Sequence, residues 1–177
     1  MAQNWTITTP RLHLAPFAPE HLDDLHAMNS DPEVTRYLAG PQTRAQVKDS
    51  IERVQERWAK HGFSWWTMFL KRSETIIGAA CLQNLAHKEN APLEIGWRLM
   101  TAYHGHGYAT EAGQAAIDFG FDRVGVDYLC AVANSENTAS QNVMRRLGMR
   151  YVGVQTHYDE ECAYFEINKS EARSGSV

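Results

Sequence analysis

The sequence predicts one domain of the α/β (α+β) class, and three observations support this prediction. The chain has 177 residues, 44% of them hydrophobic, which is enough for a single sizeable core. Segments with strand periodicity are interleaved with segments of helical periodicity, and glycines and prolines mark the boundaries between them. No internal repeat is found. We assign the domain to residues 1–169 and expect the polar tail, 170–177, to be disordered.

The chain is predicted to open with a strand followed by two helices. The segment 11–17, RLHLAPF, alternates apolar and polar residues as a half-buried strand does. Pro19 then suits the first turn of a helix over 19–28. A second helix is predicted over 43–62, where Gly62 ends it. Its apolar positions recur at helical spacing: Val47, Ile51, Val54 and Trp58.

Strands and helices then alternate to the end of the chain. Residues 64–71 and 75–85 are rich in aromatic and β-branched residues and are separated by a polar turn, which indicates a hairpin. A third strand is predicted over 92–100. The remaining elements are predicted as a helix over 110–123, a strand over 127–134, a helix over 138–148, and closing strands over 151–158 and 162–169.

Composition excludes several classes of function. The net charge is -4 and the charges of both signs are mixed along the chain, so no basic stripe is present and nucleic acid is not expected as a ligand. No window approaches the ~18 consecutive apolar residues that span a bilayer, and the N-terminal segment lacks the pattern of a signal peptide. We therefore expect a soluble, cytoplasmic protein without a membrane partner. The three cysteines are too few and too far apart for a disulfide framework or a metal site: Cys81, Cys130 and Cys162.

The segment YHGHGYATEAG, 103–113, is predicted to bind a phosphate group. It joins a strand to a helix, so the first unpaired N–H groups of the helix face an anion at the strand end. Gly105 and Gly107 bring the backbone close to such a ligand, and Ala109 is the next smallest residue. The helix also presents a face of small residues that allows close packing on the sheet: Ala109, Ala112, Gly113, Ala116 and Gly120.

Other interpretations of this loop fit less well. A P-loop would need Gly-Lys-Ser/Thr, whereas Gly107 is followed by Tyr108. A dinucleotide fingerprint would end at Thr110 instead of glycine or alanine, and Asp127, the candidate ribose ligand, begins its strand. A metal site formed by the two histidines would need further ligands at matching spacing, so we expect no metal. A plain strand-to-helix connection is the remaining alternative.

Two segments resemble a known family: EIGWRLMTAYHGHGYATEAGQAAIDFGF and NSENTASQNVMRRLGM. They are similar to the GCN5-related N-acetyltransferases (GNAT), and within them to the ribosomal-protein N-terminal acetyltransferase (RimJ/RimL-like) branch. The family signature, Gln/Arg-x-x-Gly-x-Gly/Ala, matches at Gly107 and Ala109, while His104 replaces its first residue. The branch's customary arginine in the first strand is Ala15 here, which concerns the substrate side. The resemblance implies the GNAT fold, a mixed, mostly antiparallel twisted sheet of about six to seven strands flanked by about four helices.

The resemblance implies acetyl-CoA as the cosubstrate. The loop would hold its pyrophosphate through His104, Gly105, His106, Gly107, Tyr108, Ala109 and Thr110. The free edge of the strand at Trp97, Arg98 and Leu99 would pair with the pantetheine amides. Asn137 stands where the family has an asparagine that contacts CoA, and it also suits a helix N-cap.

Direct attack of an amine on the thioester needs a base and a proton for the leaving thiolate, but no covalent nucleophile. Glu94 is the candidate base, acting through water, because the family often carries a glutamate on this strand; a solvated glutamate facing outward is the alternative. Many family members protonate the thiolate with a tyrosine, which is Met144 here. Ser140, one helical turn earlier, is the candidate replacement, and a small residue near the helix cap is the alternative.

The expected function is therefore an acetyl-CoA-dependent N-acetyltransferase acting on a primary amine, with a protein N-terminus as the first choice of acceptor. A small-molecule amine such as a polyamine, an amino acid or an antibiotic is the alternative acceptor. A non-catalytic sensor that binds acetyl-CoA is a third hypothesis. A homodimer is compatible with the resemblance, because dimers are common among similar proteins.

Overall fold

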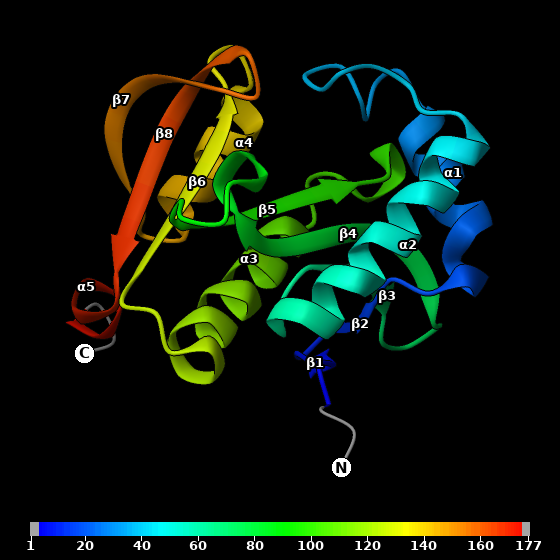
Figure 1. Ribbon diagram of the computed structural model, residues 1–177, viewed down its shortest axis with the longest axis horizontal. Helices are drawn as coiled ribbons and strands as arrows, with labels where there is room; N and C mark the ends of the chain where they lie inside the picture. The colour runs from blue at the N-terminus through cyan, green and yellow to red at the C-terminus, as the bar shows by residue number, and fades with distance from the viewer. Residues whose placement is uncertain (1–3, 175–177) are drawn as a thin grey trace.

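A twisted sheet forms the centre of the computed structural model, which describes residues 4–174 (Figure 1). Within these residues the sheet has eight strands in the order β1-β2-β3-β4-β5-β6-β8-β7. Their bounds are β1 Ile7–Thr8, β2 Leu12–Pro16, β3 Trp65–Leu70, β4 Thr75–Asn84, β5 Leu93–Leu99, β6 Tyr128–Asn134, β7 Arg150–His157 and β8 Glu160–Asn168. Seven of them, β2 to β8, match the strands predicted from the sequence to within two residues at either end.

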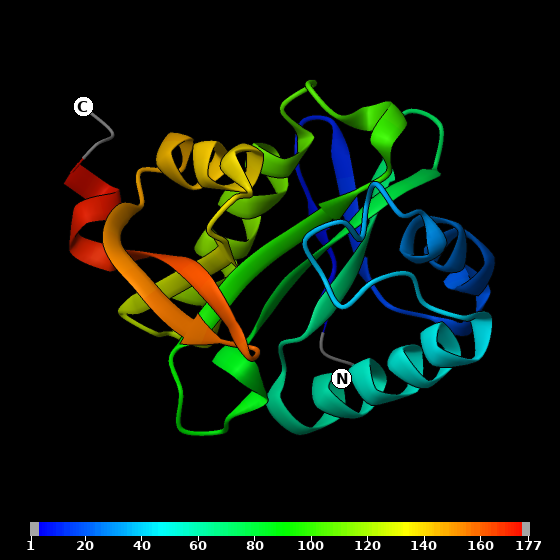
Figure 2. The same ribbon diagram turned by 90° about the horizontal axis from the view of Figure 1, so that it is seen from above.

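Helices cover both faces of the sheet. Seen from above, α1 and α2 lie on one face and α3 and α4 on the other (Figure 2). The α-helices of the described residues are α1 Leu22–Ser30, α2 Arg44–His61, α3 Tyr108–Asp118, α4 Thr138–Arg146 and α5 Lys169–Ser174. Short 3-10 turns at Pro19–His21, Leu85–His87 and Thr101–Tyr103 and a π-helical turn at Phe119–Val124 complete the elements. None of the described helices combines the length and the hydrophobicity that crossing a bilayer requires.

The one parallel contact in the described sheet positions the site. Every pair of neighbouring strands is antiparallel except β5 and β6, which confirms the mixed, mostly antiparallel sheet predicted. Strands β5 and β6 pair only at Glu94 and Cys130, whereas β5 pairs with β4 over its whole length. Beyond Glu94 the two strands diverge, so the β6 side of β5 is open from Ile95 to Leu99.

The sequence underestimated the sheet by the short strand β1, which pairs with β2 through two residues, Ile7 and Thr8. A two-residue strand is too short for an alternating pattern to reveal. The prediction of a disordered tail was wrong for residues 170–174, which belong to α5. Glu171 accepts hydrogen bonds from the backbone and side-chain N–H groups of Asn168, and Lys169 Nζ donates to the Phe121 carbonyl over 2.6 Å. Residues 175–177 of that tail lie outside the described residues.

Close packing fixes the direction of α3. Its predicted face of small residues is turned toward the sheet, with Ala112 and Ala116 fully buried. A Cβ at Gly113 would lie 2.7 Å from Leu147 Cδ1 and 3.3 Å from the Trp97 ring, so a larger residue would have to displace the Leu147 side chain. The N-terminus of α3 is thereby held at the end of β5, beside the open edge.

Candidate active site

The glycine loop places unpaired N–H groups beside a large cavity. Gly105 and Gly107 have φ of +77° and +79°, in the left-handed region that favours glycine. Gly107 is the N-cap of α3, and no side chain caps the helix there among the described residues. Tyr108, Ala109 and Thr110 form the first turn of α3 and, with both glycines, line a cavity of about 1170 Å³. The free N–H groups and the helix dipole therefore favour an anion at this point.

Arg11 adds a positive charge to this loop. Its guanidinium donates to the His106 carbonyl over 2.8 Å and lies 4.7 Å from the centre of the Tyr108 ring. Its Nε pairs with Glu111 over 2.6 Å. Sequence reasoning missed Arg11, because the loop lies 95 positions further along the chain and nothing in the local pattern connects the two.

Glu111 ties the start of the chain to α3. It accepts hydrogen bonds from Thr9 Oγ1 over 2.6 Å and from the Arg11 N–H over 2.9 Å. Burial raises the pKa of Glu111, but these hydrogen bonds and the Arg11 charge outweigh burial, so its net pKa is lowered. Glu111 therefore stays ionised and holds Arg11 beside the loop.

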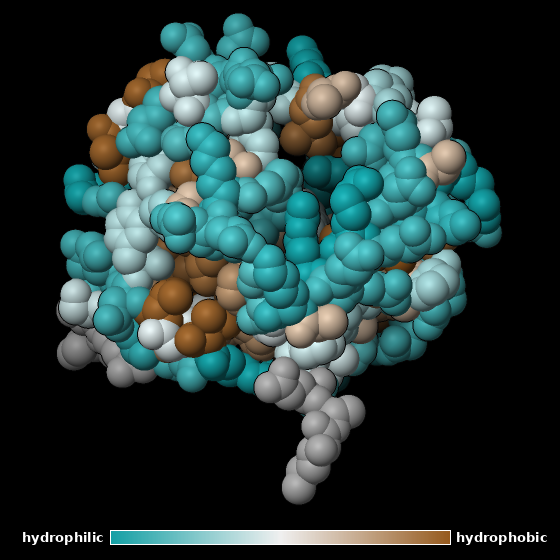
Figure 3. Space-filling view, in the orientation of Figure 1, coloured by the Kyte–Doolittle hydropathy of each residue, from teal (hydrophilic) through white to brown (hydrophobic). Residues whose placement is uncertain are grey.

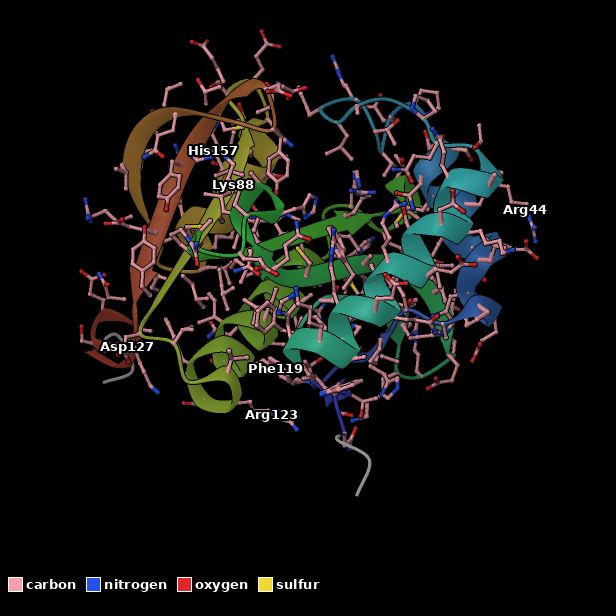
Figure 4. The ribbon with its side chains drawn as sticks, in the orientation of Figure 1. Arg44, Lys88, Phe119, Arg123, Asp127 and His157 are labelled. Carbon is pink, nitrogen blue, oxygen red and sulfur yellow. The ribbon has the colours of Figure 1, made fainter. Side chains whose placement is uncertain are left out.

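The two loop histidines have separate neighbours. His104 Nε2 lies 3.1 Å from the Leu99 carbonyl oxygen, at the end of β5, and the His106 ring lies beside Tyr108 at 5.8 Å. No cluster of three or more histidine, cysteine, aspartate or glutamate side chains suited to a metal occurs within residues 4–174. Asp127 lies beside α5, past the C-terminal end of α3 (Figure 4), where its carbonyl accepts the Lys169 N–H.

The open edge of β5 lies between this loop and a second cavity. Trp97 and Arg98 line the second cavity and Leu99 lines the first. The side chains of Trp97 and Arg98 point to opposite faces of the sheet, toward α3 and α1 respectively. The backbone edge from Ile95 to Leu99 thus runs from one cavity to the other, as an amide-bearing ligand would need.

The second cavity brings the predicted catalytic residues together. It has a volume of about 570 Å³ and is lined by Glu94, Asn137, Ser140 and Met144, among other residues. In the space-filling view the molecule is hollowed between the β7–β8 hairpin and the 31–42 segment, and the rim is largely hydrophilic (Figure 3). The site is therefore reachable from the surface on the side opposite the glycine loop.

Glu94 is a buried carboxyl group held by hydrogen bonds, which rules out the solvated alternative. Glu94 is only 5% exposed. Its Oε1 accepts a hydrogen bond from Gln83 Nε2 over 2.7 Å and another from the Tyr158 hydroxyl. Gln83 is held in turn by Trp65, whose Nε1 donates to Gln83 Oε1 over 2.9 Å. Burial raises the pKa of Glu94 to about 7, and the hydrogen bonds from Tyr158 and Gln83 limit the increase. A carboxyl group with this pKa is suited to accept protons near neutral pH.

Tyr158 is the second residue that sequence reasoning missed. It lies in the turn between β7 and β8 with a φ of +54°, and its hydroxyl also accepts the Ala86 N–H over 3.1 Å. Burial and the neighbouring Glu94 charge raise the pKa of Tyr158, so its hydroxyl remains a proton donor. Only the fold brings Tyr158 to Glu94, because a turn tyrosine carries no recognisable signal in the sequence.

Asn137 and Ser140 meet at the start of α4. Asn137 Oδ1 accepts the Ser140 N–H over 3.1 Å, so Asn137 is the N-cap of the helix. Both residues also line the second cavity, and Met144 follows Ser140 by one turn on the same wall. The capping role of Asn137 therefore coexists with a position at the site.

Comparisons with known proteins agree with this geometry. Residues 11–150 match the family described as acetyltransferase (GNAT) domain. An uncharacterised N-acetyltransferase, p20 of Bacillus licheniformis, is 31% identical over 157 residues, 88% of each chain. A solved GNAT-family acetyltransferase from Bacillus anthracis is 25% identical, with a TM-score of 0.80 over 93% of this chain and 99% of that one. The ribosomal L7/L12 alpha-N-protein acetyltransferase RimL, solved with coenzyme A, is 15% identical, with a TM-score of 0.76 over 92% of this chain and 97% of that one.

Proposed function

The chain belongs to the GNAT acetyltransferase family, and from this premise we propose that it transfers the acetyl group of acetyl-CoA to the N-terminus of a protein. The observation that carries the proposal is Glu94, a buried carboxyl group with a pKa of about 7 where β5 and β6 separate. The opening of its cavity to the surface suits the end of a chain (Figure 3). The fold similarity to RimL supports the same acceptor class.

The residues of the chain fit acetyl-CoA, which supplies the reactive thioester. The uncapped start of α3 and Arg11 would hold the pyrophosphate, since both offer donors to an anion at Gly107. The open backbone of β5 at Trp97, Arg98 and Leu99 would pair with the pantetheine amides. His104 leaves less of that edge free, because its ring contacts the Leu99 carbonyl.

In the proposed mechanism Glu94 receives a proton from the acceptor amine, directly or through one water molecule. The neutral amine nitrogen then bonds to the thioester carbonyl carbon, and the carbon–sulfur bond breaks. Tyr158 and Gln83 hold the carboxylate in place while it receives the proton. The departing thiolate takes its proton from the hydroxyl of Ser140, which in turn receives the second proton that the amine nitrogen loses as the amide forms; Met144 on the same wall has no proton to donate.

Substituting Ser140 tests this last step. We expect Ser140→Ala to lower kcat by about ten- to a thousandfold, the size of general-acid effects, with little change in the affinity for acetyl-CoA. Asn137→Ala should instead weaken α4 and the binding of acetyl-CoA, because the N-cap of the helix is lost. Steady-state kinetics with titration of acetyl-CoA separate the two. A wild-type kcat for Ser140→Ala would leave solvent as the proton source.

Substituting Tyr158 tests whether it positions Glu94. The Tyr158 hydrogen bond lowers the pKa of Glu94, so Tyr158→Phe should move the acidic limb of the kcat profile to a pH above about 7. Burial of the carboxyl group is unchanged, so the limb should move and not disappear. The measurement is kcat against pH for both proteins. An unmoved limb with a uniformly lower kcat would mean that Tyr158 acts only through the stability of the hairpin.

The proposed function is tested by release of CoA from acetyl-CoA with a panel of N-terminal peptides and small amines. Turnover confined to peptides supports the proposal. The volume of the acceptor cavity, about 570 Å³, also lies in the range of small-molecule sites, which favours a small amine as the second candidate. Turnover on small amines alone would establish that candidate, and binding of acetyl-CoA with no turnover would indicate a sensor.

A further inference from the structure

We infer that the acceptor amine carries an anionic group, a carboxylate or a phosphate, which binds Arg98 and two arginines of α2 while the amine lies at Glu94. The two arginines are Arg53 and Arg57, and all three line the acceptor cavity together with Glu94. The inference rests on the proposed function and names the substrate class of that site.

Arg98 lies on the floor of the cavity. It follows Glu94 by four residues on β5, so both side chains leave the same face of the strand, with their Cα atoms about 13 Å apart. Between them lies Gly96, which has no side chain to fill the space. The guanidinium donates to Asn29 Oδ1 and lies 5.3 Å from the centre of the Trp65 ring. A path along the floor therefore connects the base to a cation.

The charge of Arg98 is not balanced within the protein. No carboxylate of residues 4–174 forms an ion pair with it, and its one hydrogen-bond partner, Asn29, is neutral. A guanidinium has five N–H donors, so most of them are left for a ligand. A charge surrounded by protein without an opposite charge is unfavourable, and an anionic ligand would relieve that cost.

Two arginines of α2 add to the positive charge of the cavity lining. Arg53 and Arg57 are four residues apart and therefore share one face of the helix. Arg53 donates to Ser50 Oγ over 2.9 Å, whereas Arg57 makes neither a hydrogen bond nor an ion pair within the described part of the chain. His87 also lines the cavity; burial lowers its pKa, and the charges of Arg57 and Arg53 lower it further, so both arginines contribute positive potential inside the cavity.

Among the described residues, the carboxylates of the cavity form no ion pair with these cations. Glu94 is held by Gln83 and Tyr158, and Glu160 lies 3.4 Å from Asn134 Nδ2. Trp65 spans the two regions, because its Nε1 donates to Gln83 while its ring faces Arg98. The cavity therefore offers a carboxylate and separate cations that are not paired with it, which complements a ligand with an amine and an anion.

The test compares acceptors in pairs whose members differ in the presence of one anionic group. The pairs are peptides with glutamate or glutamine in second place, and ω-amino acids with their amides; an amino sugar with and without a phosphate is the third pair. We expect the anionic member of at least one pair to be preferred in kcat/KM by about ten- to a hundredfold, as charge-assisted hydrogen bonds provide. The pair with the largest preference identifies the source of the anion.

Variants then assign the preference to the cations. Arg57→Gln should remove much of it without harm to folding, because Arg57 has no partner to lose within the described residues. Arg98→Gln should remove most of the preference, mainly by raising KM for the anionic acceptor. Arg98→Lys, which keeps the charge, should retain part of the preference. Lys48→Gln is the matched control, since Lys48 lies on the same helix outside the cavity and pairs with Glu52 at 3.9 Å. The control should leave the preference unchanged.

Equal kcat/KM for both members of every pair would overturn the inference, and so would a preference that survives both Arg57→Gln and Arg98→Gln. These results would leave the proposed acetyl transfer intact, because neutral amines would still be acetylated. If no amine is acetylated, the proposed function fails, and the melting temperature with CoA and each pair member decides the inference. A larger increase for the anionic members supports it, and equal increases overturn it.

Discussion

Replacing Glu94 with glutamine is expected to lower kcat by about a hundred- to ten-thousandfold, the contribution of a well-placed general base. Glutamine has the shape of glutamate and can still accept from Gln83 and Tyr158, so the two hydrogen bonds are kept. What it loses is the ability to take a proton from the amine. Steady-state rates with saturating acetyl-CoA measure the effect. A variant with near wild-type kcat would exclude Glu94 as the base.

The pH dependence makes this test specific. Burial raises the pKa of Glu94 to about 7, so wild-type kcat should decrease as the pH falls through about 7 and the carboxylate is protonated. In kcat/KM the acceptor contributes a second limb near its own amine pKa, about 8 for a protein N-terminus. Glu94→Gln should abolish the limb near 7 and keep the limb of the amine. Retention of both limbs would assign the lower one to another group.

Stability provides the folding control for the same variant. The pKa of Glu94 in the folded protein is above its ordinary value of 4.5, so the folded state binds more protons than the unfolded state between about 4.5 and 7. The stability from this group is therefore present below pH 4.5 and is lost as the pH rises through about 7. At pH 8 the wild type buries an ionised carboxylate, whereas the substituted side chain is neutral. Glu94→Gln should then melt at the wild-type temperature or above it.

The local patterns of the sequence predicted the elements well because each records a periodicity. The alternation in β2 and the helical spacing of Val47, Ile51, Val54 and Trp58 follow directly from which side faces the core. The glycine loop could also be predicted from local sequence, because a glycine directly before a helix of small residues is a local pattern. In the structure Gly107 is left-handed. The family resemblance then supplied the mixed, mostly antiparallel sheet, which these patterns leave open.

The chemistry of the site depended on contacts between distant segments. Leu93 and Ile95 flank Glu94 in the same way whether it faces solvent or the interior, so the sequence left its burial open. The burial of Glu94 follows from the β7–β8 hairpin, which places Tyr158 over the carboxylate. Arg11 and the glycine loop are likewise joined only in the fold, through Glu111 and the His106 carbonyl. No local pattern encodes such contacts.

Acetyl-CoA at about a hundred times its dissociation constant is expected to raise the melting temperature by about 5 to 10 °C, because a ligand that binds only the folded state stabilises it by mass action. Pantetheine, which lacks the pyrophosphate, should have a much smaller effect if the α3 N-terminus and Arg11 hold the phosphates. An unchanged melting temperature with millimolar acetyl-CoA would contradict this prediction.

Gly107→Glu should abolish the increase in melting temperature altogether. Its carboxylate would stand where the phosphates bind, and it could pair with Arg11, whose Nη2 lies 3.4 Å from the position of a Cβ at Gly107. Because Gly107 has a φ of +79°, any side chain there also strains the backbone, so Gly107→Gln is the matched control. It introduces the same strain and nearly the same volume without the charge. We expect Gly107→Gln to weaken acetyl-CoA binding only partly. Equal losses in both variants would mean that the shape of the loop, and not its positive potential, determines binding.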